Sequence, residues 1–347
     1  MPAEGEIARL VAELLGAEPD SVERLRGGAN NVVARVVVGG RAVVAKAYFA
    51  HPRDPRDRVG TEFDTLSFLW RNGVRCVPEP VAVSRDDRVG VYGFVEGVPL
   101  AADEVSAADA AQLADLLGRM WELRTDPEAR QLPAASEAFF TLAAYLEGIE
   151  RRLERLRAAL DTATGAAAAR AFVEEEVVPR VGLVRQFVEA CGSDLDRELP
   201  GAERTLSPAD FGFHNALRRG DGTLVFLDFE YAGWDDPATV LSQGCLAPEV
   251  PMPSSQRDAF VRDLLGRFGN PAALADRFRL VYPLVALKWS MVVLNDFLPV
   301  ESERRAFAGT DRFRRPAQLA KSRRLLAEVD AACAGETGLA AELSGST

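Results

Sequence analysis

The chain contains three side chains that can accept a proton or bind a metal ion, namely Asp210, Asn215 and Asp228. Their spacing is one that phosphoryl transfer can use. Asp210 and Asn215 share one predicted loop, and Asp228 ends the apolar run of residues 224–227. In such chemistry one carboxylate orients the attacking hydroxyl and accepts its proton. An amide oxygen and a second carboxylate supply the hard ligands that Mg²⁺ prefers while it bridges nucleotide phosphates. The spacing therefore predicts Asp210 as the base and Asn215 and Asp228 as metal ligands.

Glu230 adds a possible fourth member to this set. It follows Asp228 by two residues, so it faces the same side if the strand continues. That position makes it a candidate for a further metal contact, either direct or through water. Asp210 or Asn215 taken alone is an ordinary loop residue or helix cap. The prediction depends on the combination, which also needs elements that bring the parts together.

The first 97 residues form a predicted β-rich lobe. Two β-branched runs cover residues 32–38 and 42–48, and Gly39–Gly40 between them predicts a two-residue hairpin. A helix follows over residues 59–71, with further short strands up to Gly97. This lobe would present side chains of its strands and its helix toward the rest of the chain.

Residues 98–335 form a second, larger and mostly helical lobe. Its helical pattern is interrupted by β runs over residues 205–233 and includes a long helical hairpin near residues 138–190. Residues 336–347 are small and polar, which is typical of a flexible tail. Two lobes agree with the chain length, because 347 residues exceed what one hydrophobic core usually supports.

The segment from Asp210 to Pro237 resembles the active site of the aminoglycoside phosphotransferase and choline kinase superfamily, relatives of the eukaryotic protein kinases. The family pattern is an Asp, four residues, an Asn, an apolar strand and a second Asp, followed by a further Asp before Pro. The likeness extends over about residues 20–245. It implies an α+β, bilobal protein-kinase-like fold that uses ATP and Mg²⁺.

The resemblance also implies roles for residues of the first lobe. Lys46 corresponds to the strand lysine that pairs with the α- and β-phosphates, and Glu62 on the next helix could reach it. Phe94 and Val95 lie in the hinge that bonds the adenine edge. A glycine-bearing loop would cover the phosphates with backbone amides, although the same residues also make ordinary turns. Its candidate residues are Gly27, Gly28, Asn30 and Asn31.

The implied function is an ATP- and Mg²⁺-dependent kinase that phosphorylates a hydroxyl of a small molecule, such as a sugar, amino sugar or amino alcohol. The alternative is a kinase-like binding or regulatory protein without phosphotransfer activity. Pro208 favours the alternative slightly, since the family usually has a bracing His there. His214, directly before Asn215, is a candidate either to replace that brace or to face the substrate.

Composition excludes several other classes. A net charge of −11 argues against nucleic-acid binding, which needs an excess of Lys and Arg. The start of the chain lacks the pattern of a signal peptide, and the apolar residues 280–298 are interrupted by Pro283, Lys288 and Asp296. The four cysteines are scattered, which favours a reducing cytoplasm. The expectation is a cytoplasmic monomer or homodimer that binds neither nucleic acid nor membrane.

The identity of the acceptor is left open by the sequence. The acceptor is expected between the catalytic loop and the C-terminal helices, under the helical hairpin. Lys288 and Trp289 are candidates for the wall of its pocket. Asp235 and Asp236 would suit a cationic acceptor, although the family gives such residues a structural role. Basic residues gathered between positions 304 and 324 point instead to an anionic partner or to a solvated helix face.

Overall fold

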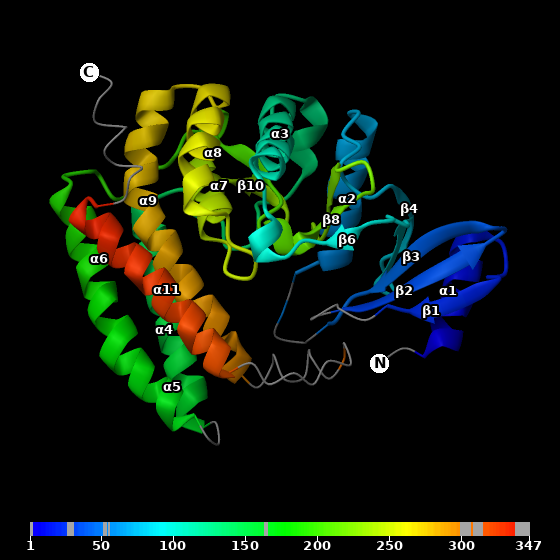
Figure 1. Cartoon of the computed structure of the whole chain (residues 1–347), viewed down its shortest axis with the longest axis horizontal. Coiled ribbons are helices and arrows are strands. Elements are labelled where there is room, and N and C mark those ends of the chain that lie inside the picture. The colour runs from blue at the N-terminus through cyan, green and yellow to red at the C-terminus, as the bar shows by residue number, and fades with distance from the viewer. Residues whose placement is uncertain are drawn as a thin grey trace.

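The computed structural model describes residues 3–25, 31–50, 54, 56–162, 166–298, 307 and 315–336. A small lobe built on an antiparallel sheet stands beside a larger lobe that is mostly helical (Figure 1). The predicted α+β, bilobal fold is therefore confirmed. The exact boundary at Gly97 stays a prediction, and the predicted tail lies outside the described residues except for Glu336.

The small lobe contains a five-stranded sheet in the order β1-β2-β3-β5-β4, with every neighbouring pair antiparallel. Gly39 and Gly40 join β2 to β3 with φ of 57° and 78°, which a type I′ hairpin turn requires. Helix α1 (Glu4–Leu15) packs Ile7, Leu10 and Val11 into the core of this sheet. The strands are β1 Ser21–Arg24, β2 Val32–Val38, β3 Arg41–Ala47, β4 Pro80–Ser84 and β5 Val89–Gly93.

Helix α2 (Arg58–Arg71) connects the two lobes. Asp57 caps its start by accepting from the amide of Gly60 at 2.9 Å. Its buried residues Leu66, Phe68 and Leu69 belong to the core of the large lobe. The helix is therefore fixed against that lobe while its first turns approach strand β3 of the small one.

Two small antiparallel sheets carry the loop that contains Asp210. One has the order β6-β8-β9, and in the other β7 pairs with β10. The loop follows β7 and ends in a short 3₁₀ turn, η5 (Phe213–Asn215). The strands are β6 Val98–Pro99, β7 Thr205–Ser207, β8 Ala216–Arg218, β9 Leu224–Phe226 and β10 Gly233–Asp235.

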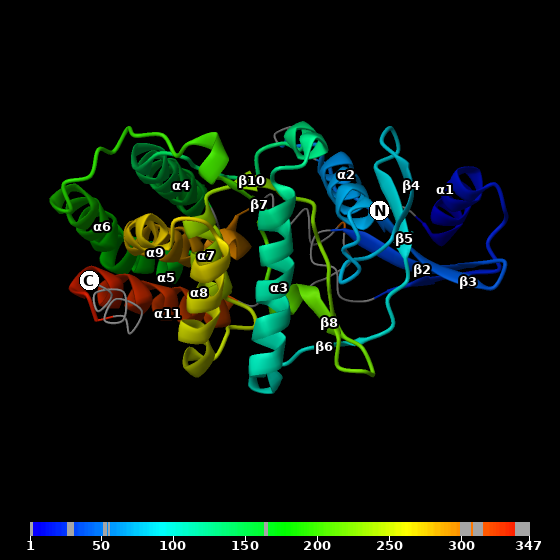
Figure 2. The same ribbon diagram turned by 90° about the horizontal axis from the view of Figure 1, so that it is seen from above.

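Helices make up the rest of the large lobe, and Figure 2 shows α4 beside α9 on the side away from the small lobe. The α-helices are α3 Ala107–Leu123, α4 Leu142–Thr162, α5 Ala167–Phe172, α6 Val178–Ala190, α7 Pro237–Leu246, α8 Ser254–Arg267, α9 Pro271–Val292 and α11 Arg315–Ala334. The remaining helical turns are η1 Ala102–Glu104, η2 Pro127–Gln131, η3 Val173–Val177, η4 Gly201–Glu203 and η6 Val293–Phe297.

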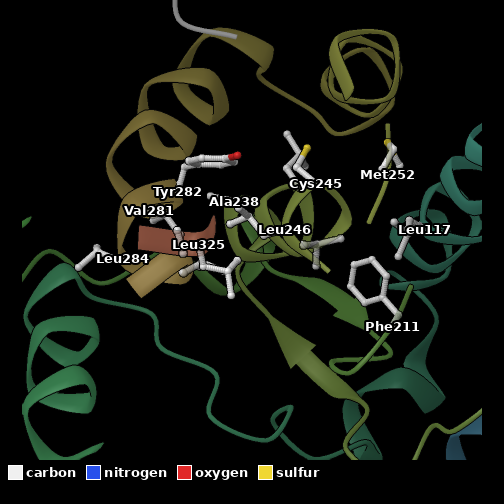
Figure 3. Packing of buried hydrophobic residues seen from close by; sticks show 14 of the residues in the cluster. Leu117, Phe211, Ala238, Cys245, Leu246, Met252, Val281, Tyr282, Leu284 and Leu325 are labelled. Atoms are coloured by element: carbon white, nitrogen blue, oxygen red, sulfur yellow. The ribbon is translucent and has the colours of Figure 1, made fainter. Parts of the chain in front are cut away.

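Helix α9 lies at the centre of the large core. Among the described residues, the stretch Pro271–Phe297 is long and apolar enough to cross a membrane, but 78% of its most apolar window is buried in the protein. Figure 3 shows Val281, Tyr282 and Leu284 of α9 within this core. Such burial is typical of the central helix of a packed lobe.

Candidate active site

Lys46 of β3 meets three carboxylates that come from distant parts of the chain. Its Nζ lies 2.6 Å from Glu62 Oε2, 2.6 Å from Asp228 Oδ1 and 3.4 Å from Glu230 Oε2. Burial alone would lower the pKa of Lys46, but the charges of Asp228, Glu62 and Glu230 outweigh it and raise that pKa well above its usual value. The ammonium therefore stays charged, and the structure brings together Lys46 and Glu62 as the sequence predicts.

Tyr48 holds the carboxylate of Glu62 from the other side. Its hydroxyl donates to Glu62 Oε2 at 2.6 Å and lies 2.7 Å from the hydroxyl of Tyr92. The amide of Phe229 donates to Glu62 Oε1 at 3.3 Å. Both oxygens of Glu62 are thus fixed, so α2 sets the position of the Lys46 ammonium.

Asp228 lies just beyond β9 in a backbone conformation that is rare for a residue with a side chain. Its φ is 68°, in the left-handed region that Asp tolerates better than most residues. The amide of Leu227 bonds the carbonyl of Asn215 at 2.7 Å, which ties this turn to the catalytic loop. The side chain of Asp228 is 29% exposed, so its carboxylate can still reach a ligand while it contacts Lys46.

Glu230 is fully buried and already has partners within the protein. Asn31 Nδ2 donates to its Oε2 at 2.6 Å, and Arg58 Nη1 lies 3.3 Å from its Oε1. Oxygen atoms of Glu62, Asp228 and Glu230 all lie within 4.8 Å of one another, so the cluster is suited to a cation. In this structure the ammonium of Lys46 supplies that positive charge.

Asn31 joins a segment of the small lobe to a residue of the large lobe. Its amide nitrogen bonds Glu230, and its Oδ1 accepts from the amide of Phe49 at 3.2 Å. Both polar ends of this predicted nucleotide-binding side chain are therefore used within the protein. The other candidates of the same loop, Gly27, Gly28 and Asn30, lie outside the described residues.

The loop after β7 places Asp210 beside Asn215. Asn215 Nδ2 donates to the backbone carbonyl of Asp210 at 2.9 Å, which leaves its Oδ1 available to a metal ion. Phe211 and Phe213 are buried and anchor the loop, and Phe211 lies among residues of α3 and α7 (Figure 3). Ala209 has a φ of 67°, where an L-residue is strained. The structure thus unites Asp210 and Asn215 on one rigid turn.

His214 contacts the predicted base directly. Its Nε2 lies 3.5 Å from Asp210 Oδ1. Burial lowers the pKa of His214, but the hydrogen bond and charge of Asp210 outweigh this and raise it. Its Nδ1 is buried and has no hydrogen-bond partner in the described part of the chain. Of the two roles open to His214, this contact agrees with a brace for Asp210.

The predicted hinge follows strand β5. The amide of Phe94 bonds the carbonyl of Ala42 at 3.4 Å, and Arg35 lies over the Phe94 ring. Within the described residues, the backbone N–H and C=O of Val95 make no hydrogen bond. The polar groups of Val95 are therefore available to the edge of an adenine ring.

Sequence reasoning missed Arg58 and Tyr48. Arg58 is buried, pairs with Asp54 and Glu230, and lies over the ring of Tyr231. Its pairing with Asp54 is local, but its contact with the site could not be predicted from the local sequence, because Glu230 is 172 positions away. Tyr48 could have been found, since it is two residues after Lys46 on a strand and so shares a face with it.

A scan against family models matches residues 21–276 to the phosphotransferase enzyme family. The search of curated protein sequences gives no match. Solved structures that resemble the chain include a spectinomycin phosphotransferase in complex with ADP and spectinomycin, with a TM-score of 0.62 and 12% identity over 96% of this chain and 99% of that one.

Choline kinases have the same fold. The enzyme of Cryptosporidium parvum Iowa II gives a TM-score of 0.59 and 11% identity over 92% of this chain and 93% of that one. The choline kinase LicA of Streptococcus pneumoniae gives a TM-score of 0.58 and 16% identity over 93% of this chain and 98% of that one. At such low identities these likenesses show the fold, and the acceptor must be argued from the residues of this chain.

Proposed function

This chain belongs to the phosphotransferase enzyme family, and we propose that it transfers the γ-phosphoryl group of ATP to a hydroxyl of a small molecule. The acceptor oxygen attacks the γ-phosphorus, the bond from that phosphorus to the β–γ bridging oxygen breaks, and ADP leaves. The proton of the hydroxyl passes to the carboxylate of Asp210. Small-molecule kinases with this fold include enzymes that act on choline and on spectinomycin.

One observation carries the proposal: Lys46, Glu62 and Asp228 meet with Nζ–O distances of 2.6 Å although they come from β3, α2 and the turn after β9. A charged lysine held in place by a buried glutamate offers a fixed positive charge to phosphate oxygens. Such a preorganised charge stabilises the transition state without reorganising when the reaction occurs.

The residues around Asp228 also fit Mg²⁺. Asn215 keeps a free amide oxygen, and the carboxylate of Asp228 is partly exposed; both are hard oxygen donors. When bound, Mg²⁺ would neutralise charge on the phosphates. A contact between Glu230 and Mg²⁺ stays a prediction. If a water molecule mediated that contact, the bonds of Glu230 to Asn31 and Arg58 would stay intact.

The first experiment needs no knowledge of the acceptor. Thermal unfolding is followed with ATP, with ATP plus Mg²⁺ and with GTP plus Mg²⁺, for wild type and Asp228→Ala. Ligand at a hundred times its dissociation constant adds about 2.7 kcal/mol to the free energy of unfolding. We expect a Mg²⁺-dependent rise that Asp228→Ala loses. No rise with any nucleotide would contradict the proposal.

A second measurement separates an active kinase from a nucleotide-binding protein without transferase activity. Release of ADP is followed without acceptor, because water can replace the hydroxyl slowly. We expect slow, Mg²⁺-dependent release that Asp210→Asn abolishes while nucleotide still stabilises the variant. Stabilisation by nucleotide with no ADP release from the wild type would favour the binding or regulatory alternative.

A further inference from the structure

A cavity of about 240 Å³ lies between α4, α9 and the segment just before α4. Helices α4 and α9 pack against each other, so the cavity lies within the large lobe (Figure 2). Its volume is below the 300 to 1,000 Å³ usual for drug-sized ligands, so it suits a small metabolite. The sequence predicts the acceptor between the catalytic loop and the C-terminal helices, under the helical hairpin to which α4 belongs.

The lining of this cavity is strongly basic. Lys288 of α9 and three arginines of α4 line it, and Glu137 is the single acidic residue among the lining residues. The protein as a whole has a net charge of −11, so this excess of positive charge is local. The three arginines are Arg151, Arg152 and Arg155.

Lys288 is the most informative of these residues. Its exposed fraction is 8%, yet its ammonium makes no hydrogen bond or ion pair in the described part of the chain. An isolated buried charge is costly, and proteins usually pair it. Trp289, the other predicted wall residue, does not line the cavity. Among the described residues, the ammonium of Lys288 lies 6.0 Å from the centroid of the Trp289 ring and has no carboxylate partner.

The acidic groups around Lys288 are engaged elsewhere. Glu137 forms an ion pair with Arg152. Asp235 accepts from the amide of Asp236 at 2.8 Å, and burial raises the pKa of Asp235 to about 7 against the opposing charge of Lys288. Asp236 bonds Arg277 and caps α7, so neither aspartate presents a free carboxylate to a cationic acceptor.

Asp210 is one of three carboxylates whose charge acts on Lys288. Burial lowers the pKa of Lys288, and the charges of Glu137, Asp235 and Asp210 only partly offset that effect. A molecule bound to this ammonium would have to extend to Asp210 for its hydroxyl to react there.

Lysine is scarce in this chain. Lys46, Lys288 and Lys321 are the only lysines among 41 basic residues, and the others are arginines. Two of the three are buried, and the first of them serves the predicted phosphate side. A compact ammonium suits a buried position where a ligand supplies the negative charge.

We propose that this cavity receives the acceptor and that the acceptor carries an anionic group, a carboxylate or a phosphate, that Lys288 binds. The proposal rests on the proposed function of the same site. A cationic acceptor would meet the ammonium of Lys288, and the one lining carboxylate, Glu137, is already paired with Arg152. The cavity therefore selects hydroxylated anions over amines and neutral polyols.

Binding is tested with four probes at equal ionic strength, each added to protein saturated with Mg²⁺ and a non-hydrolysable ATP analogue. Gluconate, sorbitol and glucamine share one polyol chain and differ in the charge of one end, and glycerol phosphate supplies a phosphate group. We expect gluconate or glycerol phosphate to raise the unfolding temperature, and whichever does so identifies the anionic group. Stabilisation by glucamine alone, or by no anion, overturns the proposal.

Variants then locate the bound anion. Lys288→Met keeps the volume of the side chain and should weaken the apparent affinity for the anion at least tenfold. Lys288→Arg should retain most of the affinity, and Lys321→Met, the same change at a half-buried lysine that pairs with Glu249 outside the cavity lining, should have no effect. An unchanged affinity in Lys288→Met overturns the proposal. If Lys288→Met does not fold, Lys288→Gln takes its place.

The same titrations keep the two proposals apart. Stabilisation by the ATP analogue is read before any probe is added. If the analogue binds and no anion does, only the acceptor proposal fails. If the analogue itself does not bind, the proposed function fails first.

Discussion

Lys46 and Lys288 are both buried, but they have opposite surroundings. Lys46 contacts Glu62 and Asp228 at 2.6 Å, and neighbouring carboxylates raise its pKa well above the usual value. Lys288 contacts no carboxylate among the described residues, and burial lowers its pKa. The first charge is balanced by the protein before any ligand arrives. We propose that a bound anion balances the second charge, so that the first lysine belongs to a permanent scaffold and the second to a binding site.

The largest expected effect comes from removing the balanced charge. In Lys46→Met, kcat should fall about 10²- to 10³-fold, because a preorganised charge opposite the phosphates is lost. Lys288→Met should lower slow ADP release without acceptor less than Lys46→Met does, because Lys288 lines the proposed acceptor cavity and lies outside the carboxylate cluster around Lys46. Steady-state kinetics of both variants decide the comparison. Equal losses of ADP release in the two variants would contradict the different roles of Lys46 and Lys288.

The acceptor side should have its own dependence on pH. Folding raises the pKa of Asp235 to about 7, so the stabilising contribution of its protonated form is complete below the unfolded value near 4 and is lost as pH rises through 7. Over this window the free energy of unfolding of the wild type should fall by about 2 to 4 kcal/mol, whereas Asp235→Asn should not show this fall. Urea denaturation at pH 4.5 and 7.5 measures the free energy of unfolding of both proteins. Parallel losses in both proteins would rule out Asp235 as the cause.

A smaller effect is expected when the support of Lys46 is weakened. Glu62→Gln keeps the shape and the bond from Tyr48 but removes the charge opposite the ammonium. We expect about a tenfold loss in kcat, the lower end for groups that orient a functional residue. Asp64→Asn on the exposed face of the same helix is the control. A loss as large as that of Lys46→Met would mean that Glu62 acts on the substrate itself.

The smallest effect concerns the loop that carries Asp210. Ala209 has a φ of 67°, which costs an L-residue about 1 to 2 kcal/mol. Ala209→Gly should therefore raise the free energy of unfolding by up to about 1 kcal/mol after the entropy of glycine is counted, with kcat unchanged. Ala110→Gly within α3 should instead lower it. Chemical denaturation compares the two, and destabilisation in both would show that Ala209 is not strained.

The sequence predicts the fold and much of the site because the informative signals are local. Apolar, β-branched runs predict β2 and β3, and the Asp210–Asn215 spacing lies within one loop. The bond between Asn31 and Glu230 joins residues 199 positions apart, so no local pattern could predict it. The left-handed backbone of Asp228 and the basic cavity beside α9 likewise arise only when distant elements pack together.

The contrast between the buried lysines has a further consequence for covalent chemistry. An amine reacts as a nucleophile only when it has lost its proton, so the lowered pKa of Lys288 makes it the more reactive of the two buried amines. The carboxylates around Lys46 keep that amine protonated and unreactive. A small acylating reagent that enters the cavity should modify Lys288 before Lys46, and a bound anion should protect it. The extent of acylation, read peptide by peptide in a mass spectrometer, would therefore report how much of the cavity is filled.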